Sequence, residues 1–245
     1  MLDSSARLLV SHCKSGSSAF LQTMSGHPDV HTVYQQIKSG QRNLDGPDYT
    51  FFDRTPPDGR SFIVGKETIG HSTEQDCKLD VFGDPSNVAR SLPIFLFRDP
   101  LRAWNSWFKV GWGDLDYFSM AYGHALEVLR LAKEVSNSVR FTVYELFCEN
   151  PHESFEEVCT FWGIPFDPNI LQWQTRFGVD SAVEFGDDVR GHLGAGDLKS
   201  VVDSSRFECK PSELVIPQSD IDIVNKLFRA EYERLFELCK IKILS

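Results

Sequence analysis

The sequence predicts an α/β protein with a mainly parallel central sheet flanked by helices. Three observations carry this prediction. Apolar segments of strand length alternate along the chain with longer amphipathic segments, as in strands joined by helical crossovers. Segment 94–97 (IFLF) is apolar throughout, which is typical of a strand covered on both faces. Small residues and a lysine fill positions 14–18, between one of the predicted strands and a helix.

The predicted elements follow in order along the chain. Strands are expected at 6–12, 60–66, within 91–100 (SLPIFLFRDP) and at 139–145. Helices are expected from 17 until Gly26 and Pro28 stop the first one, then over 101–110, 118–135, 151–162 and 219–240. Asp99 and Asn150, each followed by proline, are predicted N-caps of the helices that they precede.

Two stretches are expected to lack regular structure. Residues 40–60 are rich in Gly, Pro and Asp, so we expect a loop there. Residues 183–215 show no clear period. Because no repeat or low-complexity linker divides the chain, residues 1–245 are expected to form a single domain.

Composition narrows the classes of function. The 245 residues carry a formal net charge of −10, which argues against a basic nucleic-acid platform but leaves room for a local anion pocket. The longest apolar run, 92–97, is far shorter than the roughly 20 residues of a membrane helix. The N-terminus lacks the pattern of a secretory signal. Six scattered cysteines, with no CxxC pair, argue against a metal site and a disulfide framework and favour a reducing, cytoplasmic location.

The segment CKSGSS (13–18) is a candidate anion site. A turn of small residues before a helix directs backbone N–H groups, and the positive end of the helix dipole, at one point. Lys14 adds a mobile charge, and the hydroxyls of Ser15, Ser17 and Ser18 add donors beside Gly16. The GxxxxGK[ST] motif of ATP- and GTP-binding loops is absent. A tight turn capped by serines is the structural alternative.

A second candidate lies at the end of the strand 94–97. Arg98 follows that strand and Ser106 lies two turns into the next helix. Ligands of open α/β sheets bind at the carboxyl edge of the strands, and a guanidinium there can hold a phosphate. The structural alternative is that Arg98 pairs with Asp99 or another surface acid.

Taken in order, these segments resemble the sulfotransferases that use 3′-phosphoadenosine 5′-phosphosulfate (PAPS), a family with a P-loop fold like that of nucleotide kinases. CKSGSS is similar to the family's 5′-phosphosulfate loop, and RDPLRAWNS (98–106) to its 3′-phosphate motif. The segment 143–168 (VYELFCENPHESFEEVCTFWGIPFDP) resembles the family's YEDL…FLGIPFD stretch. VRGHLGAGD (189–197) is a weaker match to RKGxxGDW. The resemblance spans residues 7 to about 199.

The resemblance implies roles for particular residues. The 5′-phosphosulfate would bind over Lys14, Ser15, Gly16, Ser17 and Ser18, with Lys14 stabilising the leaving group. The 3′-phosphate would bind Arg98 and Ser106, together with Arg190 and Gly191, and Tyr144 would lie near the adenine. PAPS would be the co-substrate and PAP (adenosine 3′,5′-bisphosphate) the product, with no metal required.

The catalytic base is not fixed by the resemblance. Cytosolic members of the family carry Lys-Thr-His on the strand before the 3′-phosphate strand, with the histidine as base. Here VGKETIGHS (64–72) places Thr68 at the histidine position. Glu67, with Lys66 beside it, and His71, if the turn at Gly70 folds back, are the two main candidates. Another residue, such as His12 just before the loop, or no base at all are the remaining alternatives, although His12 is more typical of a packed residue. Glu67 could instead pair with Lys66, and His71 could be a solvated loop residue.

The expected acceptor is a small molecule with a hydroxyl or amine and an apolar or aromatic part, because an aromatic-rich stretch (104–118) follows the phosphate motif. Neither nucleic acid nor a membrane is an expected partner. The chain length favours an enzyme of microbial or specialised metabolism. The alternatives are a kinase-like activity on the same scaffold and a non-sulfating relative with a binding or scaffolding role. Acceptor identity and oligomeric state lie beyond the sequence.

Overall fold

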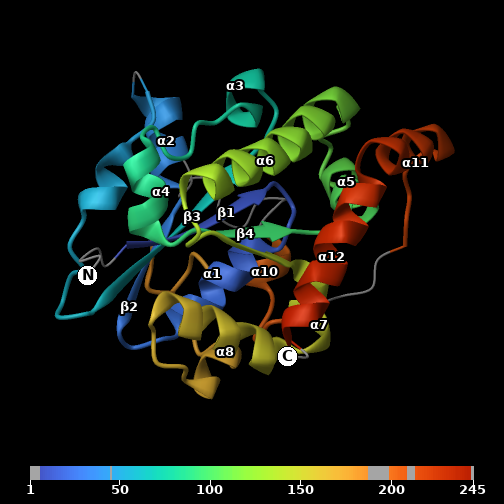
Figure 1. Cartoon of the computed structure of the whole chain (residues 1–245). Coiled ribbons are helices and arrows are strands. Elements are labelled where there is room, and N and C mark those ends of the chain that lie inside the picture. Colours follow the sequence, from blue (N-terminus) through green and yellow to red (C-terminus); the bar gives the residue numbers. More distant parts are fainter. Residues whose placement is uncertain (1–5, 45, 187–198, 209–212, 244–245) are drawn as a thin grey trace.

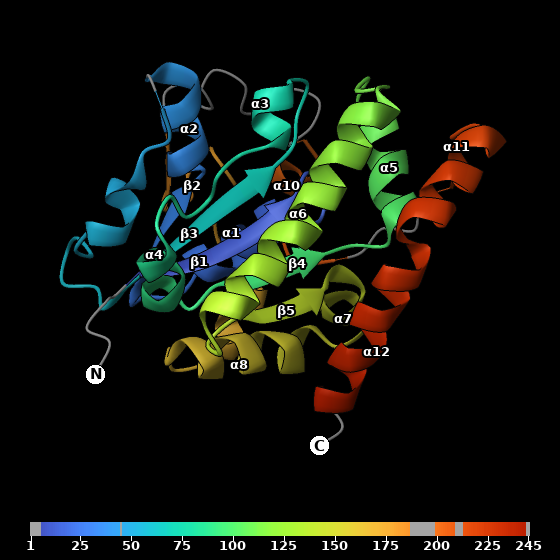
Figure 2. The same ribbon diagram turned by 45° about the horizontal axis from the view of Figure 1, so that its top comes forward.

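The computed structural model describes residues 6–44, 46–186, 199–208 and 213–243 (Figure 1). Within these ranges six strands form one sheet in the order β5-β4-β1-β3-β2-β6. All neighbouring pairs are parallel, and Figure 2 shows the arrowheads of β1, β3 and β4 at the same edge. The strands are β1 (Ala6–His12), β2 (Val30–Tyr34), β3 (Phe62–Ile69), β4 (Ile94–Phe97), β5 (Arg140–Val143) and β6 (Val183–Phe185). The predicted parallel α/β architecture is confirmed.

Helices join the strands and cover both faces of the sheet. Those before β5 are α1 (Ser17–Ser25), α2 (Gln36–Asn43), α3 (Glu74–Cys77), α4 (Pro85–Ser91), α5 (Pro100–Lys109) and α6 (Leu115–Val135). Those after it are α7 (Tyr144–Glu149), α8 (Pro151–Trp162), α10 (Lys199–Val202), α11 (Gln218–Val224) and α12 (Ala230–Ile243). Short 3-10 turns lie at Tyr49–Asp53 and Pro168–Leu171, and a π-helical turn (Asn225–Arg229) joins α11 to α12.

Alternating strand side chains build two separate apolar layers. Leu8, Val10 and Phe95 face one layer, which contains α5, α6 and the C-terminal helices. Leu9 and Leu96 face the other, which contains α1 and α8. Figure 1 shows α6 and α12 on one side of the sheet and α1 and α8 on the other. Burial on both faces explains why these strands are continuous apolar runs.

Strand β1 lies at the centre of the sheet, with β3 on one side and β4 on the other. The chain therefore crosses β1 when it passes from β3 to β4. The point where the strand order reverses is where open α/β sheets bind ligands, in the crevice beyond the carboxyl ends of the strands. The two predicted phosphate segments, 13–18 and 98–106, leave the carboxyl ends of β1 and β4, which are neighbours.

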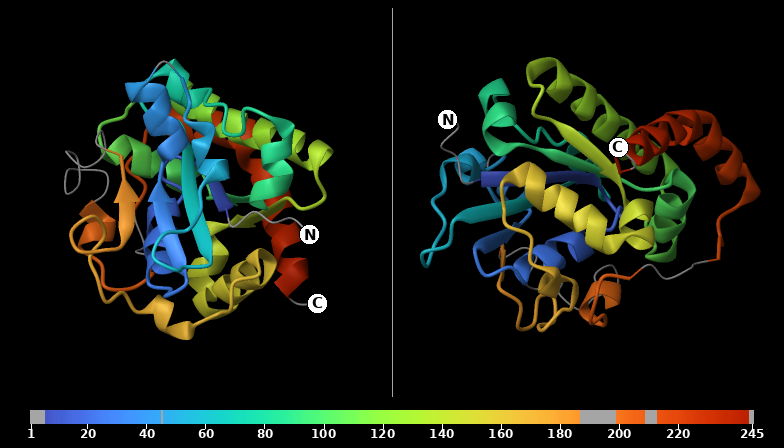
Figure 3. Two further views of the ribbon diagram at one scale, coloured as in Figure 1. Left: turned by 90° about the vertical axis from the view of Figure 1, so that its left-hand side faces the viewer. Right: turned by 60° about the horizontal axis from the view of Figure 1, so that its bottom comes forward.

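The predicted loop at 40–60 is wrong in part. Helix α2 extends to Asn43, and a 3-10 turn occupies Tyr49–Asp53. Strands β2 and β6 were not predicted, and Figure 3 shows β6 (orange) beside β2 at the edge of the sheet. Asp99 caps α5 as predicted, because its side chain accepts from the backbone N–H of Arg102, whereas the side chain of Asn150 makes no capping hydrogen bond.

The cysteines differ from one another in state. Cys13, Cys77, Cys159 and Cys239 are free and buried. Cys148 is disulfide-bonded, which departs from the expectation that the scattered cysteines stay reduced. In the described ranges no helix is long and apolar enough to span a membrane.

Two side-chain contacts dock the C-terminal helix against the ends of β4 and β5. The hydroxyl of Tyr232 donates to Glu145 at 2.8 Å, and the guanidinium of Arg229 pairs with Asp99 at 2.7 Å. Glu145 also accepts from the backbone N–H of Asp99 at 3.1 Å, and burial raises its pKa. These contacts hold the segment that carries Arg98 and Tyr144.

Candidate active site

The loop after β1 has the backbone geometry of an anion cradle. Lys14 and Gly16 both have positive φ, +65° and +92°, on either side of Ser15. Such alternation turns successive N–H groups toward one point, and α1 begins directly afterwards at Ser17. The first N–H groups of a helix have no partners within the helix, so they are available to an anion.

Gly16 is required for two reasons. Its φ of +92° favours glycine, and a Cβ built there would lie 2.2 Å from ring carbons of Tyr144. The aromatic ring of Tyr144 is therefore in direct contact with the loop backbone. Its other neighbour is the guanidinium of Arg98, whose central carbon lies 5.0 Å from the ring centroid. Tyr144 thus lies against both predicted phosphate segments, and burial raises its pKa.

Arg98 joins the two segments directly. Its Nη1 donates to the backbone carbonyl of Lys14 at 3.0 Å. The two segments meet because β1 and β4 are parallel neighbours, so both segments leave the sheet at the same edge. The two segments that were expected to bind the two phosphates of one nucleotide therefore lie in contact.

His12 connects the same two segments through its imidazole ring. Its Nδ1 donates to the carbonyl of Cys13 at 2.9 Å, and its Nε2 accepts from the backbone N–H of Arg98 at 3.3 Å. The ring is fully buried against Phe97 and Tyr122. Burial lowers the pKa of His12 to about 3, so the ring is neutral at pH 7 and can accept from Arg98.

Lys66 approaches the loop from β3. Its Nζ lies 3.4 Å from the hydroxyl of Ser18 and 3.8 Å from the ring centroid of Tyr34. The side chain is almost fully buried. Its buried ammonium lies beside the first turn of α1. The anion cradle therefore has a cation from β3 in addition to Lys14, which belongs to the loop itself.

Glu67, the neighbour of Lys66, is engaged elsewhere. Its two carboxylate oxygens accept from the backbone N–H groups of Ile37 and Lys38, at 2.8 and 3.2 Å, and so cap the N-terminus of α2. Burial raises its pKa to about 7, although the two backbone hydrogen bonds oppose the change. Because strand side chains alternate, Glu67 points to the opposite face from Lys66.

His71 follows the turn at Gly70 and lies near the loop through one shared neighbour. Its ring centroid is 4.3 Å from that of Trp112, and the Nζ of Lys14 is 4.9 Å from the Trp112 ring. The turn does fold back, since Gly70 has φ +100° and its carbonyl accepts from the thiol of Cys13 at 2.7 Å. His71 and Lys14 thus share Trp112 as a neighbour.

Three polar atoms near the loop are buried without a hydrogen-bond partner in the described part of the chain. They are the hydroxyls of Ser15 and Thr68 and the Nε of Arg98. An unsatisfied buried donor costs on the order of 1–3 kcal/mol, so a native fold retains one where something else satisfies it. The donors of Ser15 and Arg98 fit an anionic group that would supply acceptors at both positions.

Several predicted residues are not brought into this cluster. Ser106 is half-buried on α5, and its hydroxyl makes no hydrogen bond within the described residues. Arg190 and Gly191 lie outside the described residues. Of the aromatic residues after the phosphate motif, Trp104, Trp107 and Phe118 are buried in the core, whereas Trp112 faces the loop. Within the described ranges no group of His, Cys, Asp and Glu side chains is arranged to hold a metal ion.

The sequence prediction missed Lys38 and Asp76 as neighbours of the site, whereas Trp112 belongs to the aromatic-rich stretch that was expected near the acceptor. Lys38 lies on a helix that was predicted as partly loop. Asp76 stands three residues after Thr73, a spacing typical of a capped helix start, and its backbone N–H does donate to the Thr73 hydroxyl at 3.1 Å. The spacing of Thr73 and Asp76 could have predicted the start of this short helix and hence the position of Asp76.

A cavity of about 430 Å³ lies beyond Tyr34, between the ends of β2 and β6 and α2. Its described lining includes two carboxylates, Asp48 and Glu184, and no lysine or arginine. Arg54 and His31 hold Glu184, and the hydrogen bonds from Arg54 lower its pKa to about 2. The cavity therefore suits a neutral or cationic group and not a phosphate. It adjoins the site through Tyr34, which contacts Lys66.

No family model matches the sequence, and no curated protein matches it. Solved structures do resemble the fold. Mouse sulfotransferase SULT7A1 complexed with PAP superposes with a TM-score of 0.53 at 15% identity, covering 94% of this chain and 84% of that one. Retinol dehydratase in complex with androsterone and inactive cofactor PAP superposes with a TM-score of 0.50 at 12% identity, covering 92% and 80%. The chain therefore has the sulfotransferase fold.

Proposed function

We propose that the protein is a PAPS-dependent sulfotransferase that transfers a sulfuryl group to a hydroxyl or amine of a small molecule. The observation that carries the proposal is the contact of Arg98 with the Lys14 carbonyl, which brings two phosphate-binding segments to one edge of the sheet. A nucleotide with phosphates at its 5′ and 3′ positions requires two such segments close together. Two solved proteins of the same fold contain PAP.

The charges and donors at the site support a doubly phosphorylated ligand. Lys14, Lys66 and Arg98 gather there in a chain whose net charge is −10. The loop would hold the 5′-phosphosulfate through its N–H groups and the Ser15 hydroxyl, and Arg98 would hold the 3′-phosphate by charge-assisted hydrogen bonds. Tyr144, already stacked on Arg98, would flank the adenosine. Ser106, Arg190 and Gly191 stay predicted contributors to the 3′-phosphate site.

Bound PAPS supplies a sulfuryl group attached to a phosphate that is a good leaving group. The chemistry demands alignment and neutralisation of the charge that grows on that phosphate. Lys66, which reaches Ser18 in the first turn of α1 from β3, and Lys14 in the loop before that turn would share this neutralisation. No metal is required for it in this proposal.

The geometry favours His71 over Glu67 as the base that takes the acceptor proton. Both oxygens of Glu67 accept from backbone N–H groups of α2, on the face of β3 away from Lys66. His71 shares the Trp112 ring with Lys14 and keeps a third of its side chain exposed, so an acceptor can reach it. Imidazole also has an unperturbed pKa suited to proton transfer near pH 7.

The acceptor would approach beside Trp112, whose indole offers an apolar surface that both Lys14 and His71 contact. An apolar or aromatic part of the acceptor would pack there, and the cavity beyond Tyr34 would take a neutral or cationic remainder. The cytoplasmic location stays a prediction, and the disulfide at Cys148 is more typical of an oxidising compartment.

Transfer of labelled sulfate tests the proposal. The wild-type protein is incubated with PAPS labelled in the sulfuryl group and with 2-naphthol as a generic hydroxyl acceptor, then with a cell extract. We expect a labelled sulfate ester and release of PAP in equal amounts. Binding of PAP without any transfer in either mixture would support a non-sulfating relative instead. Absence of PAP binding would overturn the proposal.

A further inference from the structure

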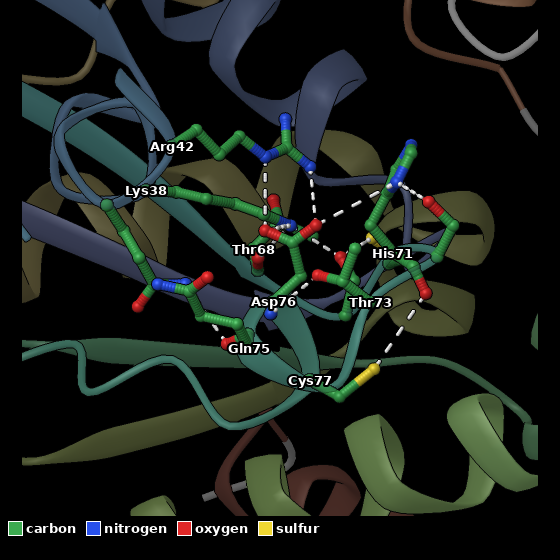
Figure 4. Close-up of polar contacts among 12 residues, drawn as sticks. Lys38, Arg42, Thr68, His71, Thr73, Gln75, Asp76 and Cys77 are labelled. Carbon is green, nitrogen blue, oxygen red and sulfur yellow. Dashed lines mark hydrogen bonds and ion pairs between the residues drawn. The ribbon is translucent and has the colours of Figure 1, made fainter. Parts of the chain in front are cut away.

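A buried ion network lies beneath the turn that carries His71. Figure 4 shows Asp76 on α3 between Arg42 and His71, and two hydrogen bonds from Arg42, at 3.0 and 2.9 Å, hold its carboxylate. Lys38 approaches the same carboxylate at 3.8 Å. The side chains of Asp76 and Lys38 are 5% and 1% exposed. Burial alone would raise the pKa of Asp76. The hydrogen bonds from Arg42, together with the positive charges of Lys38 and Arg42 and the charge of His71, outweigh burial, so the pKa is lowered and the group is charged.

Lys38 connects this network to the reaction side of the sheet. Its Nζ donates to the carbonyls of Thr68 and Gly70, at 3.0 and 2.5 Å. The Gly70 carbonyl also accepts from the thiol of Cys13, the residue before the loop lysine. A Cβ at Gly70 would lie 2.6 Å from the Cβ of Ala121, so the turn is closely packed as well. The backbone that bears His71 is therefore fixed relative to the anion loop.

The imidazole of His71 presents one nitrogen to this network. Its Nδ1 lies 2.7 Å from the hydroxyl of Ser72 and 3.9 Å from Oδ2 of Asp76. In Figure 4 the other ring nitrogen points away from Asp76. The carboxylate favours a proton on the nearer nitrogen, which leaves the lone pair on Nε2.

We propose that Asp76 is a positioning residue that keeps the proton of His71 on Nδ1 and stabilises the imidazolium formed during transfer. The inference rests on the proposed function only for the identity of the reaction. The arrangement of carboxylate, imidazole and outward Nε2 is a property of the chain itself. Arg42 and Lys38 fix the carboxylate at the required place.

The step that this arrangement serves is balanced. The acceptor oxygen forms a bond to the sulfur of the phosphosulfate, and the bond from sulfur to the bridging phosphate oxygen breaks. The electron pair of that bond stays on the phosphate of PAP. The acceptor proton passes to Nε2 of His71, and the resulting cation lies beside Asp76.

The charged groups around the imidazole come from three elements. Asp76 approaches from α3, and Lys38 and Arg42 on α2 lie behind that carboxylate. Lys14, from the loop after β1, contacts the same Trp112 ring as the imidazole. Glu74, the other acid at the start of α3, is exposed and pairs with a neighbouring lysine. Asp76 is thus the anion that offsets three nearby cations.

The network is more elaborate than packing requires. Buried charged groups are costly to desolvate, and an apolar cluster of the same volume is often as stable or more so. The two ends of the network are the turn that bears His71 and the helix α2, which Glu67 caps at its other side. A role in setting the protonation of His71 explains why these charged groups are buried, whereas a contribution to stability does not.

The test is a nuclear magnetic resonance titration of the free protein labelled in histidine, with His71 assigned from the spectrum of His71→Ala. The variants are Asp76→Asn, Arg42→Gln and Ser72→Ala. We expect the His71 midpoint to fall by about 0.5–1 pH unit in Asp76→Asn, because an adjacent opposite charge is lost. It should rise in Arg42→Gln, because a competing cation is lost. Ser72→Ala is the matched control at the same nitrogen, and it should leave the midpoint and the Nδ1-protonated tautomer unchanged.

Coinciding titrations of wild type and Asp76→Asn would overturn the proposal. If Asp76→Asn does not fold, the titration of Arg42→Gln tests the proposal instead. The Arg42 side chain is 30% exposed, so the protein tolerates its replacement better than that of the buried Asp76. An unchanged midpoint there would also overturn it. The proposal would also be overturned if the His71 tautomer changed in Ser72→Ala but not in Asp76→Asn.

A kinetic readout complements the titration. With PAPS and 2-naphthol, Asp76→Asn should lower kcat on the order of 10–100-fold and move the acid limb of its pH profile to lower pH. Its affinity for PAP, measured by calorimetry, should change less than about threefold. A wild type that fails to bind PAP would refute the proposed function, whereas the histidine titration would still decide the role of Asp76.

Discussion

The guanidinium of Arg98 lies 3.0 Å from the backbone carbonyl of Lys14, although 84 residues separate them in the sequence. The contact exists because β1 and β4 are parallel neighbours whose carboxyl ends meet at one edge. Tyr144 and His12 reinforce it from two sides, the first by stacking on Arg98 and the second by bridging the backbones. The anion loop and the arginine therefore form a single unit.

Gly16→Ala should destabilise this unit. The substitution places a side chain at φ +92° and within 2.2 Å of the Tyr144 ring. We expect the free energy of unfolding in urea to fall by about 2–3 kcal/mol. Gly113→Ala is the matched control, since a Cβ there meets nothing within 4 Å. Equal stabilities of the two variants would show that the loop rearranges at little cost.

His12 should make the protein less stable in acid. Its pKa is about 3 when folded, lowered by burial, against 6.5 unfolded. Between these values the unfolded chain binds a proton that the folded chain excludes, so stability falls as pH drops below 6.5. From pH 7 to pH 5 this group should remove about 2 kcal/mol of unfolding free energy. His12→Gln should abolish that share, as measured by urea unfolding at both pH values.

Glu67 should act with the opposite sign over the same range. Its pKa is about 7 when folded, raised by burial, against 4.5 unfolded. The folded chain now holds the additional proton, so this group should reduce stability by about 2 kcal/mol as pH rises from 5 to 7. Wild type should therefore show little net slope from these two groups, and Glu67→Gln should expose the slope of His12. Parallel profiles of wild type and Glu67→Gln would contradict the assignment.

The two base candidates separate by turnover. His71→Ala should lower kcat with PAPS and 2-naphthol on the order of 100-fold or more, while PAP binding stays within about threefold of wild type. Glu67→Gln should retain turnover, because its carboxylate binds the backbone of α2. Full turnover in His71→Ala would remove the histidine from the reaction. Loss of turnover in a folded Glu67→Gln would return Glu67 as the base.

Strong local signals made much of the fold predictable. The apolar run 94–97, the small-residue turn before Ser17 and the capped start of α5 at Asp99 are all local patterns, and the structure has each of them. Helix α2 could not be predicted in this way. It contains Gly40 and few apolar residues, and tertiary groups stabilise it: Glu67 caps it and Lys38 reaches the turn at Gly70.

The choice between Glu67 and His71 was partly available in the sequence. Strand side chains alternate, so if Lys66 faces the loop its neighbour Glu67 faces the other layer. The position of His71 beside the loop could not be predicted from the sequence. It depends on the packing of Gly70 against α6 and on the contact with Trp112, which lies 41 positions further along the chain. The approach of Asp76 to His71 depends on the same tertiary packing, so it could not be predicted either.

Calorimetric titration with two nucleotides shows whether Arg98 binds a 3′-phosphate. Wild type and Arg98→Ala are each titrated with adenosine 3′,5′-bisphosphate and with adenosine 5′-monophosphate, which lacks the 3′-phosphate. Arg130→Ala, on the exposed face of α6, controls for the loss of one positive charge. We expect Arg98→Ala to weaken binding of the bisphosphate on the order of 100-fold and of the monophosphate by less than about threefold. Equal losses for both nucleotides, or no loss for either, would contradict it.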